Sequence, residues 1–495
     1  MNILLNEQIT QQDTFLDRHK SILLTMLGDA TARATQVQRD VIASFTLPIE
    51  RYDTLQSFIG VQQVGLGEVF FWERPSEQNA LIGIGTATTI ETTGHTSSLD
   101  AATQWRALLQ DAVVASVADT QEIDAVYGTE PLFFGGFAFD PKNEHTATWA
   151  GFPDGLLILP RFLLRYSQSH SSLTMNFLVH SEDDTEQCFQ SIASDVFRLV
   201  SIIRNFKFTD EQAQTEPLLL QDTLPATAWM QKVAELARDI RHGAFEKVVL
   251  ARSVQVIHCS DASTSFDVST ILRRLRQSYP STYIFALQRG EHFFVGATPE
   301  RLVQAQNGQI HTMALAGSAP RGATQEEDEQ LGQALLQSEK NSIEHAIVVA
   351  RVREALLAHC SKVQISDTPH LLKLKNVQHL ETPIVGELLP GRCILDVMAD
   401  LHPTPAVGGF PREEALAAIR RVEQLDRGWY AGPLGWIGAG GHGEFAVALR
   451  SGLIAENEAT LFAGCGIVGD SDFQSEYEES CLKLQVMLRG LGEQN

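Results

Sequence analysis

The C-terminal part of the chain carries two carboxylates and an amine at helical spacing. Glu476 and Glu479 are three residues apart, and Lys483 follows four residues after Glu479. In a helix these three side chains share one face, and carboxylate oxygens are the hard ligands that Mg²⁺ prefers. A solvated helix surface with a Glu–Lys pair fits the same spacing. The spacing alone therefore predicts either a set of magnesium ligands or an ordinary surface.

Three further residues could take part in proton transfer or anion binding. Lys247 lies in a predicted strand, and its amine can accept a proton from water only when neutral, which requires a pKa lowered by burial or by a nearby cation. Glu300 follows Thr298 and Pro299 at one predicted strand end, and Arg450 ends another strand. Each has an ordinary interpretation as well: a solvated lysine, a turn carboxylate and a surface arginine.

The elements that must position these residues are predicted from apolar periodicity. Strand-like runs lie at 69–72, 81–84, 132–139, 156–159, 248–256, 283–288, 293–297, 434–437 and 445–449, and helix-like spacing lies at 189–204, 229–240, 338–359 and 473–488. The first 60 residues are predicted to be polar and helical, and residues 207–225, with two prolines, to be a linker or crossover loop. The mixed order favours an α/β (α+β) fold with a large mixed or antiparallel β-sandwich core flanked by helices.

A glycine-rich segment, Gly438–Gly443, matches the spacing of a dinucleotide-binding loop. Such a loop needs a helix after it, so that the helix N-terminus faces the pyrophosphate. Here a predicted strand follows, so the segment is interpreted as a hairpin turn.

Composition narrows the classes of partner. The 495 residues carry a formal net charge of −23, which repels nucleic acid and acidic membranes. We find neither a signal-like N-terminus nor an apolar run long enough for a membrane helix, so we expect a cytoplasmic protein. Six scattered cysteines form no C-x-x-C pair and favour reduced thiols. An anionic substrate would need a local positive pocket.

The second half of the chain, from Gly243 to Lys483, resembles the chorismate-utilising enzymes, which include anthranilate, aminodeoxychorismate, salicylate and isochorismate synthases. The resemblance rests on ordered blocks, which are Gly243–Arg252, Gly296–Arg301, Leu315–Ser318 with Arg321-Gly322, Ser338–His345, Val377–Leu380, His402–Ala406, Gly428–Gly432, Phe462–Ile467, and Ser475–Glu479 with Lys483. Any one block is weak, whereas all of them in this order are specific. The first half matches only in its β-rich character.

The resemblance implies a role for each candidate residue. Lys247 matches the general base of the water-using members and Glu300 the general acid that protonates the leaving C4 hydroxyl, which requires a raised pKa. Glu344 and Glu479 would bind Mg²⁺, and Glu476 would hold a coordinated water. The implied substrate-binding residues are Gly317, Ser318, His379, Ala406, Tyr430, Arg450, Gly464 and Lys483, with Arg450 gripping a substrate carboxylate through its planar fork. Asn341 stands where relatives often have another glutamate.

Three positions choose among the reactions of the family. Ammonia-using relatives carry Gln where this chain has Lys247, and aminodeoxychorismate synthases carry a nucleophilic lysine where it has Ala316. Salicylate and anthranilate synthases usually carry Thr where it has Ala406. The resemblance thus implies an isochorismate synthase, in which water adds at C2 of chorismate and the C4 hydroxyl leaves. A salicylate synthase and a non-catalytic chorismate-binding paralogue are the alternatives.

The resemblance also implies how the chain is organised. Residues 1–225 would form the N-terminal half of the fold with an extra helical segment, and residues 226–495 the chorismate-binding region, both within one intertwined domain. We expect a monomer with no glutaminase subunit. Whether the product enters menaquinone, siderophore or salicylate synthesis is left open.

Overall fold

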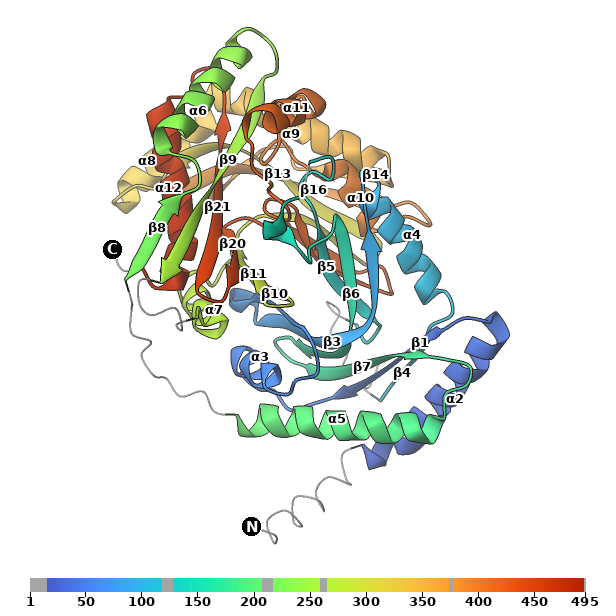
Figure 1. Cartoon of the computed structure of the whole chain (residues 1–495). Coiled ribbons are helices and arrows are strands. Elements are labelled where there is room, and N and C mark those ends of the chain that lie inside the picture. Colours follow the sequence, from blue (N-terminus) through green and yellow to red (C-terminus); the bar gives the residue numbers. More distant parts are fainter. Residues whose placement is uncertain are drawn as a thin grey trace.

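Two antiparallel sheets share the long strands β3 (Asn79–Thr92) and β6 (Gly155–Tyr166), and this sharing sets the architecture (Figure 1). The computed structural model describes residues 16–117, 128–143, 145–206, 217–258, 265–373 and 377–493. Over these residues, strand pairing is antiparallel everywhere except between β1 (Val41–Pro48) and β4 (Val113–Ser116). The fold prediction of an α/β protein with a large antiparallel sandwich flanked by helices is confirmed.

The first sheet carries the predicted base. From β3 it continues through β2 (Val69–Arg74), β10 (Tyr283–Arg289), β11 (His292–Thr298), β20 (Ser451–Ala455), β21 (Glu458–Ile467) and β9 (Lys247–His258). The short strands β8 (Leu218–Asp222) and β17 (Gly409–Phe410) pair with β9, and β7 (Ser171–Val179) joins β6 to β1.

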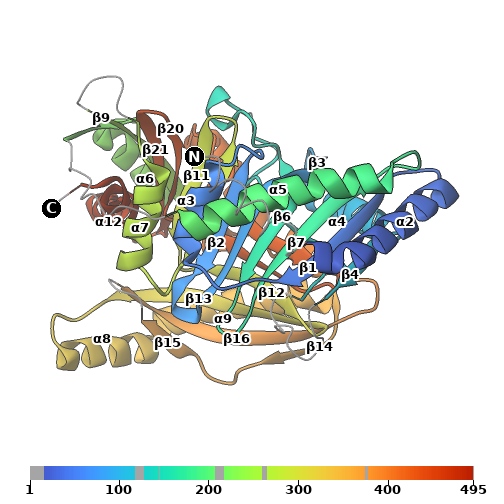
Figure 2. The ribbon, with the colours of Figure 1, turned by 90° about the horizontal axis from the view of Figure 1, so that it is seen from below.

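The second sheet carries Gly317 and Ser318 on one strand and His379 on another. From β6 it continues through β5 (Leu132–Phe137), β18 (Pro433–Gly438), β19 (Gly443–Val447), β12 (Arg301–Gln306), β13 (Gln309–Pro320) and β16 (Val377–Leu388), with β14 (Cys360–Ile365) and β15 (His370–Lys373) on β16. Figure 2 shows β13, β16 and β15 as a layer under the rest of the molecule, with α8 (Gln325–Gln337) beside them.

Apolar side chains on both faces of the strands bury two cores. Alternate residues of a strand point to opposite faces. On β2, Phe70 faces the interior between the two sheets and stacks on Phe134 of β5, with ring centroids 4.1 Å apart. Phe71 faces the other side and packs against Phe58, with centroids 5.2 Å apart. Strands buried on both faces explain the near-continuous apolar runs in the sequence.

Helices close the outer faces of the sheets. The N-terminal helices are η1 (Asp17–His19), α2 (Lys20–Val37), α3 (Thr54–Gln62), η2 (Pro75–Glu77), α4 (Ser97–Leu109), η3 (Ala147–Trp149) and α5 (Thr185–Asn205). The others are α6 (Ala226–Arg241), α7 (Val268–Ser278), α9 (Glu339–Leu357), α10 (Ile394–Leu401), α11 (Arg412–Val422) and α12 (Phe473–Leu491). Figure 1 shows α2, α3 and α5 over one end of the sandwich and α6 and α12 beside β9 and β21.

Helix α12 is fixed at its start and along one face. Asp472 caps it by accepting a hydrogen bond from the backbone N–H of Ser475 at 2.9 Å. Its apolar residues Leu484, Met487 and Leu488 are buried. The first two turns are therefore held in place, with Glu476 accepting from the Ser471 hydroxyl at 2.8 Å and Glu479 paired with Lys483.

Most predicted elements are confirmed, including the hairpin turn at Gly438–Gly443 between β18 and β19. Two predictions are wrong. The first 60 residues contain β1, which is buried on both faces and so lacks the alternation that reveals a strand. Part of the predicted linker forms β8, an edge strand whose Leu219 and Leu220 are exposed and which pairs with β9; the part at 207–216 lies outside the described residues.

No helix in the described parts of the chain is both long enough and apolar enough to cross a membrane. The cysteines within those parts, Cys188, Cys360, Cys393, Cys465 and Cys481, are free thiols. Cys259 lies outside the described residues.

Two paired glycines allow close approach of the next strand on either side of the β5–β18 ladder. Gly135 and Gly435 are partners in the ladder. A Cβ at Gly435 would lie 1.9 Å from the carbonyl oxygen of Glu444 in β19. A Cβ at Gly135 would lie 1.8 Å from the carbonyl oxygen of Leu156 in β6. Backbone atoms cannot move aside as a flexible side chain can. We predict that Gly435→Ala lowers the free energy of unfolding by about 1–3 kcal/mol or more, measured by denaturant titration followed by circular dichroism.

The matched control is Gly438→Ala in the same strand. There a Cβ would meet nothing closer than 3.7 Å, so we expect a change within about 0.5 kcal/mol. Equal unfolding midpoints for the two variants would contradict the close-approach argument.

Candidate active site

Lys247 begins β9 and is held between two neighbouring strands. It pairs with Phe410 of β17 on one edge, and Val248 pairs with Ile467 of β21 on the other. Its side chain crosses Gly466 of β21, where a Cβ would lie 3.1 Å from Lys247 Cε and 3.7 Å from Nζ. A side chain larger than hydrogen at this position would push the amine away. The glycine therefore makes room for the lysine.

The amine of Lys247 contacts the first predicted metal ligand. Its Nζ donates a hydrogen bond to Oε1 of Glu344 at 2.8 Å. Glu344 lies on α9, whose N-terminus is capped by Ser338. The two side chains are 19% and 30% exposed, so the pair lies in a partly enclosed space rather than on an open surface. Both are thus placed to meet a bound molecule.

Glu300 lies between β11 and β12, as predicted, and its carbonyl accepts a hydrogen bond from the Val447 N–H at 2.9 Å. Burial raises the pKa of its carboxyl, and the positive charges of Arg450, Lys483 and Lys247 oppose that rise. Burial prevails, because desolvation disfavours the charged form. These opposing effects identify Glu300 as a carboxyl surrounded by the three predicted cations.

The cations around Glu300 come from separate elements. Arg450 lies in the turn between β19 and β20, with a positive φ of 52°, and its carbonyl accepts from the Ala297 N–H at 3.1 Å. Lys483 of α12 donates to the Gly464 carbonyl at 2.8 Å and pairs with Glu479 at 2.7 Å. Three cations thus act on Glu300, two of which are also paired with carboxylates, Lys247 with Glu344 and Lys483 with Glu479.

Glu476 and Glu479 form a compact group with Cys465. One ligand atom of each lies within 4.8 Å of the others, and this is the group of potential metal ligands found among the described residues. Burial raises the pKa of Glu476. Burial also acts to raise that of Glu479, but Lys483 and Arg450 prevail and lower it. The oxygens of the two carboxylates are ligands of the kind that a hard divalent cation prefers, and Glu344 lies outside this compact group.

The loop at Gly317 brings polar groups toward the same region. Gly317 has a φ of +76° and lies at a register shift in the β13–β16 pairing; a Cβ there would meet the Asn341 side chain at 3.1 Å. Ser318 Oγ lies 2.8 Å from His379 Nδ1. Burial, with help from Arg450 and Lys483, lowers the pKa of His379 to about 4. His379 is therefore neutral at physiological pH and can donate or accept without adding charge.

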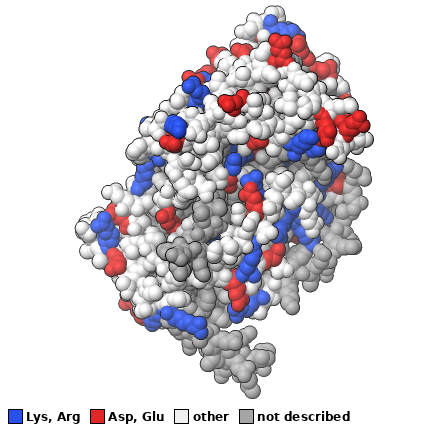
Figure 3. Space-filling model, turned by 180° about the vertical axis from the view of Figure 1, so that it is seen from behind, with Lys and Arg blue, Asp and Glu red and all other residues white. Residues whose placement is uncertain are grey.

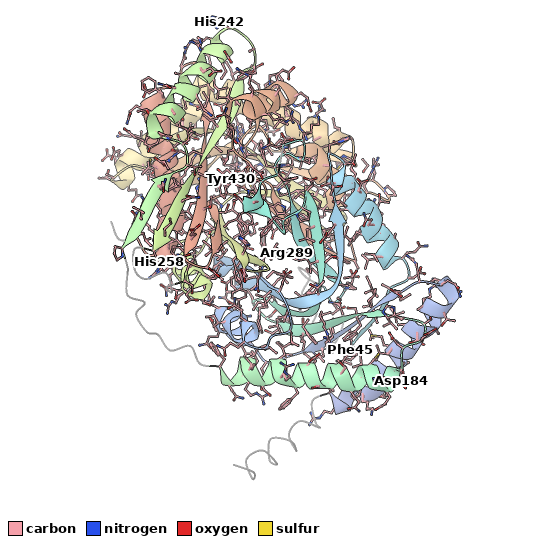
Figure 4. All side chains as sticks on the ribbon, in the orientation of Figure 1. Phe45, Asp184, His242, His258, Arg289 and Tyr430 are labelled. Carbon is pink, nitrogen blue, oxygen red and sulfur yellow. The ribbon has the colours of Figure 1, made fainter. Side chains whose placement is uncertain are left out.

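Tyr430 is buried in the interior, as Figure 4 shows, far from His242 at the outer end of the α6–β9 turn. Its ring stacks on Phe462 with centroids 5.3 Å apart and planes 18° apart. A Cβ at Gly464 would lie 3.4 Å from its hydroxyl oxygen. Burial raises the pKa of Tyr430 well above its usual range, so its hydroxyl keeps a proton to donate.

Ala406 lies in the segment between α10 and β17, which runs along β9. The carbonyl of Thr404 accepts from the N–H groups of Val407 at 3.1 Å and Gly408 at 2.9 Å, and the Gly408 carbonyl accepts from the Val249 N–H at 3.0 Å. These bonds tie the segment to the strand that carries Lys247. Ala406 is partly exposed. Its position near β9 is set by the backbone hydrogen bonds of its neighbours.

The structure adds two residues that the sequence did not single out. Gly466 lies under Lys247, and Cys465 lies under the acidic pair with a thiol whose pKa burial raises to about 12. The signal was present: in a strand, 464 and 466 share one face and 465 takes the other. The alternation of faces along residues 462–467 puts the Cys465 side chain on the face opposite to Gly464 and Gly466. If that face is turned toward the following helix, Cys465 lies near the carboxylates of Glu476 and Glu479.

The chain is similar in sequence and in structure to proteins of known name. Residues 29–492 match the family described as chorismate binding enzyme. The chain is 36% identical over 465 residues to the isochorismate synthase MenF of Bacillus subtilis, covering 94% of this chain and 96% of that protein. It is 36% identical over 468 residues to the salicylate biosynthesis isochorismate synthase of Pseudomonas aeruginosa, covering 93% and 92%. The solved structure of MenF, the menaquinone-specific isochorismate synthase from Escherichia coli, superposes with a TM-score of 0.72 at 25% identity, covering 94% of this chain and all of that one.

The fold and these matches together identify the class of enzyme to which the chain belongs. The chain belongs to the chorismate binding enzyme family.

Proposed function

We propose that this protein is an isochorismate synthase. Water adds at C2 of chorismate, the ring double bonds shift, and the C4 hydroxyl leaves as water. The observation that carries the proposal is an amine near a buried carboxyl of raised pKa: the charge of Lys247 acts on the Glu300 carboxyl, whose pKa burial raises. Full-length similarity to two proteins named isochorismate synthase supports it.

The two residues would divide the proton transfers. Lys247, in its neutral form, would take a proton from the attacking water, while protonated Glu300 would give one to the departing hydroxyl. The raised pKa of Glu300 supports the second role, because the acid must keep its proton near neutral pH. Gly466 has no side chain that would displace the Lys247 amine. The amine would therefore be able to approach a substrate from its position beside β21.

Charge explains how the pocket would hold a dianion. Arg450 and Lys483 provide two fixed cations, and the Ser318 hydroxyl, the His379 ring and the Tyr430 hydroxyl provide neutral hydrogen-bonding groups. We propose that Glu479 and Glu344 hold Mg²⁺, with Glu476 holding one of its waters. Bound Mg²⁺ would offset the negative charge of a substrate carboxylate.

The choice of nucleophile and product follows from two side chains. A glutamine at 247 could not deprotonate water, so lysine favours water over ammonia, and we propose that no glutaminase subunit is needed. The methyl of Ala406 offers no hydrogen bond to an enolpyruvyl group, which favours release of isochorismate without loss of pyruvate. A cytoplasmic monomer remains our proposal for its location and state.

Removing the base tests the first role. Lys247→Gln keeps similar size but cannot accept a proton, so we predict a loss in kcat of about 10²-fold or more with chorismate binding largely kept. Isochorismate formation is measured by chromatography and binding by calorimetry. Lys362→Gln, an exposed lysine of β14, is the control and should keep full activity. Near-native turnover by folded Lys247→Gln protein would refute the assignment.

Removing the metal tests the second role. Chelation should abolish activity and Mg²⁺ should restore it. Glu479→Gln keeps the shape but loses a charged ligand, so the Mg²⁺ concentration for half-maximal activity should rise by about tenfold or more, a loss of one favourable charge contact. Glu478→Gln, on the exposed face of the same helix, should leave it unchanged. Full activity of the chelated enzyme would exclude the metal assignment.

Position 406 tests the product. We predict that the native enzyme releases almost no pyruvate from chorismate and that Ala406→Thr releases pyruvate and salicylate, because the added hydroxyl can orient the enolpyruvyl group toward the C2 hydrogen. A coupled lactate dehydrogenase assay measures pyruvate. Ala406→Val has the same size without the hydroxyl and should release none. Pyruvate release by the native enzyme in step with chorismate loss would make it a salicylate synthase instead.

A further inference from the structure

A buried ion pair lies directly behind the proposed active site. Nη2 and Nε of Arg427 each donate to the carboxylate of Glu423 at 2.6 Å. The two side chains are 2% and 1% exposed, and the guanidinium lies 4.1 Å from the centroid of the Phe139 ring. Glu423 ends α11, and Arg427 follows four residues later in the turn that leads to Tyr430.

This pair makes the hydrogen bonds that a neighbouring strand would make on one edge of β9. On one edge of β9, β17 pairs with residues 247–248 and β8 pairs with residues 254–258. Between them, Arg427 donates to the Val249 carbonyl at 2.8 Å and Glu423 accepts from the Ala251 N–H at 2.7 Å. The Trp229 indole then donates to the Ala251 carbonyl at 3.2 Å. Side chains thus complete the hydrogen bonding of a strand edge that would otherwise be open.

Arg427 also reaches two other parts of the site. Its guanidinium donates to the carbonyl of Val407, the residue after Ala406, at 3.0 Å. Its backbone carbonyl accepts from the Tyr430 N–H at 2.8 Å. The guanidinium therefore joins the strand that carries Lys247 to the segment that carries Ala406, and the backbone of the same residue holds the turn that carries Tyr430.

We propose that Arg427 and Glu423 are positioning residues, which place Lys247 relative to the 402–408 segment without touching the substrate. This inference rests on the proposed function, because it acts through Lys247 as the base. The pair need not be there for stability: a buried ion pair loses hydration, and replacing both of its charges by neutral groups is often neutral or stabilising, whereas removing one leaves an unpaired charge. Both charges must therefore be changed together in a test.

The experiment compares two double variants. Glu423→Gln/Arg427→Met removes both charges and the hydrogen bonds donated to Val249 and Val407, while the amide oxygen introduced at 423 can still accept from the Ala251 N–H. Its control is Glu73→Gln/Arg276→Met, which removes a pair at 3.2 Å with a 3% exposed carboxylate, between β2 and α7. We expect the first to lower kcat by about tenfold or more, because small misplacements of a catalytic group have large effects, with little change in KM. The control should keep its kcat, and thermal unfolding establishes that each variant is folded.

A double-mutant cycle separates positioning from general damage. In a Lys247→Gln background the loss of the pair should have little further effect on kcat, because the base through which it acts is already gone. A loss of equal size in both backgrounds would overturn the proposal, as would native kcat in the folded Glu423→Gln/Arg427→Met protein. If that variant does not fold, Arg427→Lys decides in the same way, since it keeps the charge but lacks the planar fork that reaches both carbonyls.

The outcome is distinguishable from a failure of the proposed function. If native enzyme converts chorismate to isochorismate and the cycle shows no coupling, the positioning inference alone is wrong. If native enzyme makes no isochorismate, the proposed function is wrong.

Discussion

The antiparallel pairing of β9 with β21 is the interaction on which the rest of the site depends. It runs from Ile257 opposite Glu458 to Val248 opposite Ile467. Because alternate residues of β21 take opposite faces, the pairing presents Gly466 to Lys247 on one side and Cys465 to α12 on the other. A slip of one residue would exchange those faces and put a side chain where the lysine must lie. The positions of Lys247 and of the carboxylates beside Cys465 are thus set by one register.

The continuation of the first sheet beyond β21 brings in the other charged residues. Glu300 and Arg450 come from strand ends that β9 does not reach, and they approach Lys247 only because β11 and β20 pair with each other and continue to β21. A carboxyl surrounded by three cations would ionise readily in water, yet here burial holds its pKa up. Two opposite effects act on Glu300: the nearby positive charges favour its ionised form, and burial favours its protonated form. On the face shown in Figure 3, acidic and basic side chains are interspersed, so that the surface there offers no comparable concentration of positive charge.

Sequence reasoning reached the site more fully than it reached the whole fold. The three-and-four spacing of Glu476, Glu479 and Lys483 predicts their common face because a helix allows no other arrangement, and α12 has that face. The approach of Lys247 to Glu344 joins residues 97 positions apart and depends on how a helix packs on a sheet, which local periodicity does not encode. Strand β1 was missed for a different reason: it is buried on both faces and so shows no alternation of apolar and polar residues. The roles of these residues came from resemblance, and the geometry gives them a physical basis.

Arg450 adopts a backbone conformation that glycine would adopt more easily. Its φ of 52° lies in the left-handed region, where a residue with a side chain is strained by about 1 kcal/mol or more. The chain accepts this at the point where a guanidinium faces the pocket. Selection for heat resistance alone would favour glycine at 450, and selection for turnover would favour arginine. A thermostabilised descendant of this protein, obtained without an activity screen, would therefore be in danger of losing the arginine that we propose to bind the substrate.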